Sequence, residues 1–255
     1  MIETRINVQT VEGTMPTFVA SPEGRAPASA VLIYMDVFGP REELYEIARR
    51  YASRGYIAVL PHLFYRIGSP SFKPNNVRGQ KLEPAAGAAN NATTLAMVRR
   101  DTAAVFKCAD GGGLGRAVRA WGVIGYCMGG RHAIAAAVEY PDRVRAGISV
   151  HGGCLVDTDE SVDESPHLLV SRCRVPLHIA CATNDPTCPP EHVEVLEAEA
   201  SKTGGLVTVE TLNAEHGWSF QDRWCYDQQA AEWIWEKSLR MFPNSHFVSA
   251  TAKSD

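Results

Sequence analysis

The chain has 255 residues, of which 45% are hydrophobic and 21% are charged, and its formal net charge at pH 7 is −4. This balance is ordinary for a globular domain, and it provides neither a basic patch nor a nucleic-acid-binding motif. The sequence opens into a strand-like segment and contains no apolar stretch of about 18 residues. We therefore expect a cytoplasmic protein without a signal peptide and without a membrane or nucleic-acid partner.

Seven cysteines are scattered along the chain, with no Cys-x-x-Cys pair among them. An odd number at these spacings predicts neither a disulfide framework nor a thiolate zinc site, and it fits a reducing compartment. No spacing of Asp, Glu, His and Cys indicates a metal site. We expect no metal, no cofactor, a small-molecule substrate, and a monomer or weak homo-oligomer.

The N-terminal segments 5–10 and 14–20 alternate between apolar and polar residues around Glu12 and Gly13, which predicts an antiparallel hairpin. Later apolar runs are short and are mostly separated by helix-length segments. This pattern is typical of a parallel sheet with helices on both faces. The predicted strands are 30–34, 56–60, 118–124, 146–150, 177–182 and 206–212, and the predicted helices are 42–53, 93–108, 131–139, 190–203 and 226–242.

We expect one α/β domain over residues 1–244, followed by a flexible tail over 245–255. Two segments interrupt the pattern: 66–91 is rich in Pro, Gly and Asn, and 155–170 is rich in Asp, Glu and Ser. Both are predicted to form loops or short caps. Because ligands bind beyond the carboxyl ends of the strands in open α/β sheets, these loops are candidate pocket walls.

The most informative motif is the run Gly-Tyr-Cys-Met-Gly-Gly at 125–130, between a predicted strand and a predicted helix. A nucleophile at a sharp strand-to-helix turn needs strained backbone angles, and flanking glycines remove the Cβ atoms that would collide. Cys127 would then lie at a helix N-terminus, where free N–H groups favour a thiolate or a developing oxyanion. Taken alone, the pattern also arises by chance around a buried cysteine.

A thiol nucleophile needs a base, and the base needs an acid that orients it. In α/β-hydrolases these residues follow in the order nucleophile, acid, histidine. Asp185 follows the predicted strand 177–182 and His216 follows the predicted strand 206–212, so both could meet Cys127 above the sheet. Each could also be an ordinary turn or loop residue, and His151 follows a strand as well.

An oxyanion hole in this kind of fold uses two backbone N–H groups. One belongs to the residue that follows the nucleophile, which here is Met128. The other lies in the loop after the first parallel strand, and Val37 is the predicted donor there.

The sequence resembles the dienelactone hydrolase family, also called carboxymethylenebutenolidases, from the N-terminal hairpin to about Phe242. The resemblance rests on Asp-Val-Phe-Gly at 36–39, Gly-Tyr-Ile-Ala-Val-Leu-Pro at 55–61, the run 125–130, Asn-Asp at 184–185 and Glu-His-Gly-Trp at 215–218. It implies the α/β-hydrolase fold and a triad of Cys127, Asp185 and His216. It also implies hydrolysis of an enol-lactone or related ester through a thioester, in the catabolism of aromatic compounds.

Two positions depart from the pattern of the family it resembles. A glutamate that contacts the nucleophilic thiol commonly precedes the Ile/Val-Phe-Gly stretch, and Asp36 stands here instead. It is expected either to control the ionisation of Cys127 or to cap the loop that follows it. Phe220 stands four residues after His216, where family enzymes acting on dienelactones carry an arginine that binds the substrate carboxylate. Arg223 is a nearby alternative.

The substrate pocket is predicted to be lined mainly by aromatic side chains, although these could equally belong to the core. The expected lining residues are Phe38, Phe64, His151, Trp218, Phe220 and Arg223. We expect an ester or lactone hydrolase of the dienelactone hydrolase type, with a broad carboxylesterase or activated-phosphoester hydrolase as the alternative. Two further hypotheses are a redox sensor, in which Cys154 or Cys188 resolves an oxidised Cys127, and a binding domain without catalysis.

Overall fold

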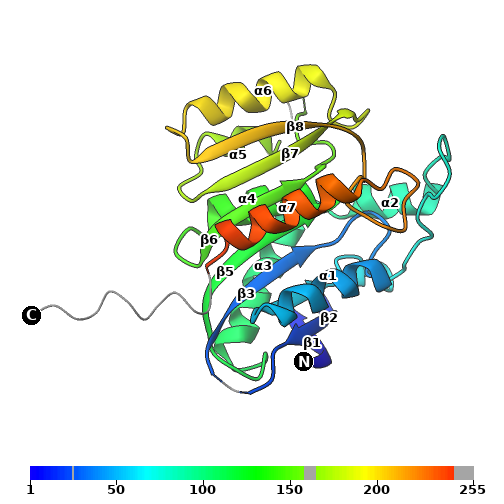
Figure 1. The fold of residues 1–255 in the computed structure, drawn as a ribbon. Helices are drawn as coiled ribbons and strands as arrows, with labels where there is room; N and C mark the ends of the chain where they lie inside the picture. Colours follow the sequence, from blue (N-terminus) through cyan, green and yellow to red (C-terminus); the bar gives the residue numbers. More distant parts are fainter. Residues whose placement is uncertain (25, 158–164, 244–255) are drawn as a thin grey trace, which may run out of the picture.

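The computed structural model describes residues 1–24, 26–157 and 165–243, and its strands form one eight-stranded sheet (Figure 1). The strands are β1 (Ile2–Thr10), β2 (Gly13–Ser21), β3 (Ala28–Tyr34), β4 (Ile57–Pro61), β5 (Val118–Tyr126), β6 (Val144–Val150), β7 (Leu177–Asn184) and β8 (Val207–Glu215). Their order is β1-β2-β4-β3-β5-β6-β7-β8. The predicted hairpin forms an antiparallel edge, with β2 antiparallel to both β1 and β4, and all other neighbours run parallel.

Helices cover both faces of this sheet, as the sequence predicts. They are α1 (Glu42–Ser53), α2 (Pro84–Ala92), α3 (Leu95–Asp110), α4 (Met128–Glu139), α5 (His167–Val170), α6 (Pro190–Ser201) and α7 (Gln228–Met241), with a short 3-10 helix η1 (Tyr65–Ile67). Figure 1 shows α1 and α7 together in front of the sheet. The Tyr51 hydroxyl of α1 donates to the Ser238 hydroxyl of α7 at 2.7 Å, which joins these two helices.

Side-chain alternation along β5 assigns the two faces of the sheet. A Cβ at Gly122 would lie 2.6 Å from the Phe242 ring just beyond α7, whereas a Cβ at Gly125 would overlap the Gly129 carbonyl in α4. Because alternate residues of a strand point to opposite faces, Tyr126 points toward the α1 and α7 side. The chain then turns into α4 on the other face.

Three helices begin at residues other than those predicted, and side-chain capping explains two of these differences. Helix α7 begins later than predicted, since the Asp227 carboxylate accepts a hydrogen bond from the Ala230 N–H at 3.0 Å. Helix α3 likewise begins after Thr94, whose hydroxyl accepts from the Met97 N–H at 3.3 Å. Helix α4 begins earlier than predicted, directly after Cys127.

The segment 66–91, predicted as a loop or short cap, contains most of α2. Pro84 stands at the start of this helix, where its missing N–H costs no hydrogen bond. Helix α5 occupies the end of the segment 155–170, while residues 158–164 and the predicted tail 245–255 lie outside the described residues. The single domain over 1–244 stays a prediction. Within the described ranges, no helix is long and apolar enough to cross a membrane.

Shortening Leu44 tests how α1 is held on the sheet. Leu44 is fully buried on the inner face of α1. We expect Leu44→Ala to lower the free energy of unfolding by about 2–5 kcal/mol, because it removes apolar contacts and leaves a cavity. Glu42→Gln, on the exposed face of the same helix, should cost about 0.5 kcal/mol or less. Urea unfolding followed by circular dichroism measures both, and equal costs would contradict this packing.

Candidate active site

The strand-to-helix turn between β5 and α4 has the strained geometry that the motif predicts. Cys127 sits at its apex with φ 51° and ψ −115°, which side-chain-bearing residues rarely adopt. A Cβ at Gly125 would overlap the carbonyl of Gly129, and a Cβ at Gly129 would lie 2.7 Å from the Met35 carbonyl oxygen. The two glycines therefore allow the end of β5, the start of α4 and the end of β3 to come together.

Asp185 and His216 meet Cys127 at the carboxyl ends of β5, β7 and β8, with β6 lying between β5 and β7. Asp185 follows β7 and His216 follows β8. The His216 Nε2 lies 3.1 Å from the Cys127 Sγ, and the His216 Nδ1 lies 2.6 Å from the Asp185 Oδ2. Thr187 donates to the other oxygen of Asp185 from its backbone N–H at 2.8 Å and from its hydroxyl at 2.7 Å. The structure thus joins these side chains in one hydrogen-bonded line.

The charges in this line support one another. Burial alone would raise the pKa of Asp185, but the hydrogen bonds from His216 and Thr187 outweigh burial and lower it. Burial alone would lower the pKa of His216, but the Cys127 sulfur and the Asp185 carboxylate raise it well above its usual value. An imidazole with a raised pKa can take a proton from a neighbouring thiol and hold it beside a carboxylate.

The two amides predicted to form the oxyanion hole belong to segments that pack together at this turn. The Met128 N–H lies in the first turn of α4, where amides lack partners within the helix. Val37 lies in the loop after β3, whose last carbonyl groups pack against Gly129. In the described part of the chain, neither amide donates a hydrogen bond.

Asp36 is fully buried and is bound by Arg41, which no motif in the sequence singles out. Its Oδ1 accepts from the Arg41 Nη1 at 2.8 Å and from the Phe38 N–H at 3.1 Å, while Arg41 also binds Asp222. Burial raises the pKa of Asp36 although Arg41 opposes the shift. Among the described residues, no hydrogen bond joins Asp36 to Cys127, so its observed contacts are with its own loop and with Arg41.

The aromatic side chains expected to line the pocket are packed in the interior. Their exposed fractions are 2% for Phe38, 1% for Phe64 and 0% for His151, Trp218 and Phe220. They therefore form part of the core, which is the alternative that the sequence left open, rather than the surface of an open cleft.

The ring of His151 packs against His216, the candidate catalytic histidine. Its ring stands edge-on to His216 with 5.3 Å between the ring centroids, and its Nε2 lies 2.7 Å from the Ser219 Oγ. Burial holds the pKa of His151 well below its usual value. His151 is thus a neutral ring that supports His216 from inside the protein.

Two arginines lie near Cys127 and His216. Arg223 is half-buried, its Nε donates to the Asn75 carbonyl at 3.0 Å, and its guanidinium packs against Gly217, next to His216. No carboxylate pairs with Arg223 in the described ranges. Arg131 of α4 donates to carbonyls near α2, and burial lowers its pKa. Arg131 directly follows the run 125–130, and this position was the feature of the sequence that could have pointed to it.

The cysteines proposed as redox partners lie in different surroundings. Cys154 is exposed and is close to the turn, since the neighbouring Gly153 N–H donates to the Cys127 carbonyl at 3.1 Å. Cys188 is 1% exposed and lies beside Cys181. All seven cysteines are free. Among the described residues, no group of three or more His, Cys, Asp or Glu side chains could hold a metal ion.

The mostly parallel sheet, with a strained turn after β5, an acid after β7 and a histidine after β8, defines an α/β-hydrolase. The model of the dienelactone hydrolase family matches residues 15–246. The chain belongs to this family and is a hydrolase, which confirms the resemblance and the fold class predicted from the sequence.

The relatives found by sequence are distant, but they agree with one another. Candidate carboxymethylenebutenolidases of Salmonella typhi and Escherichia coli are each 24% identical over 230 residues, covering 89% of this chain and 82% of theirs. A candidate carboxymethylenebutenolidase of Methylorubrum extorquens is 25% identical over 177 residues, covering 69% of this chain and 58% of its own length.

Solved structures share the fold over nearly the whole chain. A candidate dienelactone hydrolase from Klebsiella pneumoniae superimposes with a TM-score of 0.82 at 20% identity, covering 94% of this chain and 98% of that one. A dienelactone hydrolase-like promiscuous phosphotriesterase from metagenomic libraries gives 0.70 at 18% identity, covering 95% and 100%.

Replacing Asp185 tests the cause of the raised pKa of His216. Because the Asp185 carboxylate stabilises the protonated ring, Asp185→Asn should lower the pKa of His216. Asp222→Asn, which changes a carboxylate bound to Arg41, is the matched control and should leave the titration nearly unchanged. NMR titration of the His216 ring protons measures both. An unaltered titration in Asp185→Asn would contradict the assigned electrostatics.

Proposed function

We propose that the protein hydrolyses a carboxylic ester or lactone, with Cys127 as nucleophile, His216 as base and Asp185 as the residue that orients His216. The observation that carries this proposal is the hydrogen-bonded line from Asp185 through His216 to the sulfur of a residue held at positive φ. Such a line supplies all the proton transfers that acyl transfer requires.

In the first half-reaction, His216 Nε2 takes the proton from the Cys127 thiol, and the sulfur attacks the carbonyl carbon of the substrate. The carbonyl oxygen becomes an oxyanion, to which the N–H groups of Met128 and Val37 donate in this proposal. When the tetrahedral intermediate collapses, the carbon–oxygen bond breaks and the leaving alkoxide takes the proton from His216. A thioester on Cys127 remains.

In the second half-reaction, His216 takes a proton from water, and the resulting hydroxide attacks the thioester carbonyl. The carbon–sulfur bond breaks, the acid product leaves, and the proton on His216 returns to the sulfur. Asp185 keeps the ring in one orientation and balances its positive charge in both halves. Atoms and charges balance without a cofactor.

The charges near the site favour a substrate that carries a carboxylate. Arg223 lies beside the loop of His216 and has no carboxylate partner among the described residues, although it stands further along the chain than the arginine of the family pattern. A guanidinium can bind a carboxylate through two parallel hydrogen bonds. We propose that Arg223 performs this role, with a dienelactone-like acid as the substrate class.

A second candidate activity is hydrolysis of activated phosphoesters by the same residues. The structural relative described as a promiscuous phosphotriesterase favours testing it. Values of kcat/KM for a dienelactone, for neutral aryl esters and for an aryl phosphotriester, measured side by side, rank the candidate substrate classes.

Removing the thiol tests the nucleophile. Cys127→Ala should lower kcat for ester hydrolysis by about 10⁴-fold or more, because it removes the sulfur on which the acyl intermediate forms in this proposal. Cys154→Ala, which removes a thiol next to the Gly153 that binds the Cys127 carbonyl, should retain turnover. Activity assays on the purified variants, together with their thermal unfolding curves, distinguish a loss of catalysis from a loss of folding. Full turnover by the folded Cys127→Ala variant would contradict the proposal.

Neutralising Arg223 tests the substrate class. Arg223→Gln should raise KM for carboxylate-bearing esters by about tenfold or more, the size expected for losing a charge-assisted hydrogen bond. The value of kcat/KM for neutral aryl esters should change far less. Arg78→Gln, at an exposed arginine paired with Glu215, is the control. Equal losses on charged and neutral esters would show that Arg223 does not bind the carboxylate.

A further inference from the structure

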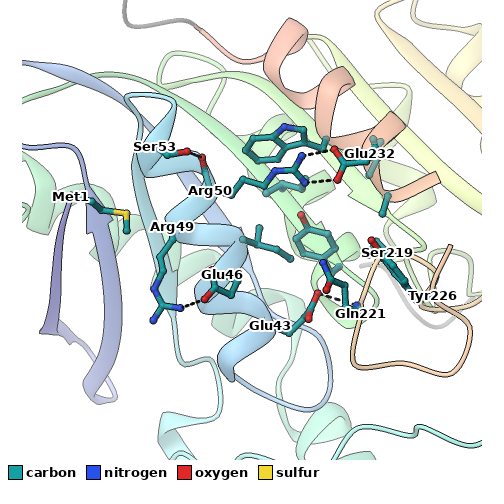
Figure 2. Close-up of a pocket in the computed structure, with 16 residues that line it drawn as sticks. Met1, Glu43, Glu46, Arg49, Arg50, Ser53, Ser219, Gln221, Tyr226 and Glu232 are labelled. Atoms are coloured by element: carbon teal, nitrogen blue, oxygen red, sulfur yellow. Dashed lines mark hydrogen bonds and ion pairs between the residues drawn. The ribbon is translucent and has the colours of Figure 1, made fainter. Parts of the chain in front are cut away.

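A cavity of about 710 Å³ lies between α1 and α7, on the face of the sheet to which Tyr126 points. We call it the α1/α7 cavity. Ile124 and Tyr126 of β5 line it, together with residues of the two helices and of the segment that holds Ser219. Figure 2 labels Glu43 and Arg50 of α1, Glu232 of α7 and Ser219 among its lining residues. Its volume falls within the range of about 300–1,000 Å³ that is typical of small-molecule sites. Neither Cys127 nor His216 lines it.

The charged groups of the cavity are unequally paired. Arg50 of α1 forms a two-point ion pair with Glu232 of α7 across the gap between the helices (Figure 2). Arg49 binds Glu46 at 2.7 Å. Both arginines are therefore already in ion pairs with carboxylates. Glu43, by contrast, has no ion-pair partner among the described residues.

Glu43 is also partly removed from water. Its Oε1 accepts one hydrogen bond, from the Gln221 N–H at 3.0 Å, and burial raises the pKa of its carboxyl group. Arg41, whose charge also acts on Glu43, is bound to Asp36 and Asp222. A carboxylate in this position has lost hydration without gaining a counter-ion, so a cation inside the cavity would compensate it.

Tyr126 provides a second, independent feature of a ligand site. Its side chain is 5% exposed, it lines the cavity, and its hydroxyl makes no hydrogen bond with any described residue. The hydroxyl is not sealed in the interior but is accessible from the cavity, so a hydrogen-bonding group of a ligand there can reach it. Ile124, Ile234 and Trp235 supply apolar surface around it.

The inner wall of the cavity adjoins the proposed active site. The Ser219 hydroxyl at the cavity lies 2.7 Å from His151 Nε2, and His151 stands against His216. Tyr126 directly precedes Cys127 in the chain. A molecule that contacts Tyr126 therefore touches the residue next to the proposed nucleophile, Cys127. A molecule that contacts Ser219 is separated from the proposed base, His216, by the ring of His151.

We propose that the α1/α7 cavity is a second binding site, which takes a small organic cation consisting of a protonated amine or guanidinium on an apolar body. The cation pairs with Glu43, the apolar body packs on Ile124 and Trp235, and a hydrogen-bonding group reaches the hydroxyl of Tyr126. Anions are disfavoured because both arginines are already paired. Binding of the cation changes turnover at Cys127 through Tyr126 and through the Ser219–His151 contact. Only this effect on turnover rests on the proposed function; the binding itself does not.

Binding is tested with 2-phenylethylammonium as the probe, and with 2-phenylethanol and 3-phenylpropionate as its neutral and anionic counterparts. Titration calorimetry and ligand-observed NMR on the full chain should show saturable binding of the cation, at least about tenfold tighter than either counterpart. Binding should persist after iodoacetamide has alkylated Cys127. Absence of saturable binding, equal binding of the neutral alcohol, or loss of binding on alkylation would overturn the proposal.

Two variants locate the site. Glu43→Gln keeps the side-chain shape and should weaken binding of the cation by about tenfold, whereas Glu42→Gln, one residue away and outside the cavity, should not. Ala231→Phe places a ring in the cavity and should block binding without changing any charge. Circular dichroism verifies that each variant is folded. Wild-type affinity in both Glu43→Gln and Ala231→Phe would refute the location.

The coupling is measured separately. Saturating probe should change kcat for ester hydrolysis by twofold or more, roughly the lower limit of a typical coupling, and should shift the NMR signals of the His151 and His216 rings. The ring signals do not depend on turnover, so they test the coupling even if the protein proves not to hydrolyse esters. Unmoved ring signals at saturation would refute the coupling.

Discussion

The backbone at Cys127 can hold its positive φ only because three chain segments touch there without intervening Cβ atoms. Gly125 faces Gly129 in α4, and Gly129 in turn faces the carbonyl groups at the end of β3. This close approach places the first turn of α4, which begins with Met128, against the end of β3, just before the loop that holds Val37. It also holds Tyr126 and Cys127 in opposite surroundings, one toward the α1/α7 cavity and the other toward His216.

Charged groups removed from water around this turn are compensated in separate sets. Asp185 and Thr187 support His216, while Arg41 binds both Asp36 and Asp222. A buried charge without a partner is expensive, so each set must form as the protein folds. Between the sets lies His151, a neutral ring in contact with His216. Glu43 stands apart from these sets because no ion pair compensates it among the described residues.

Much of the fold could be predicted from the sequence because short-range patterns determine it. The alternation of residues 5–20 predicts the hairpin, and the apolar runs predict the parallel strands in nearly their observed positions. Helix α2 was missed because the Pro, Gly and Asn residues before it resemble a loop. The ends of α3 and α7 were misplaced because the hydrogen bonds of Thr94 and Asp227 are decided by side-chain orientation.

The sequence by itself determined which chemical groups follow which strands: Cys127 after β5, Asp185 after β7 and His216 after β8. Because β5 to β8 run parallel, their carboxyl ends lie at one edge of the sheet, and the three residues follow them there. Only the tertiary structure decided that Asp36 binds Arg41, that the predicted pocket aromatics are buried, and that Glu43 and Tyr126 share a cavity. The physical reason is that these contacts join residues far apart in the chain, so burial and pairing are set by packing and not by local pattern.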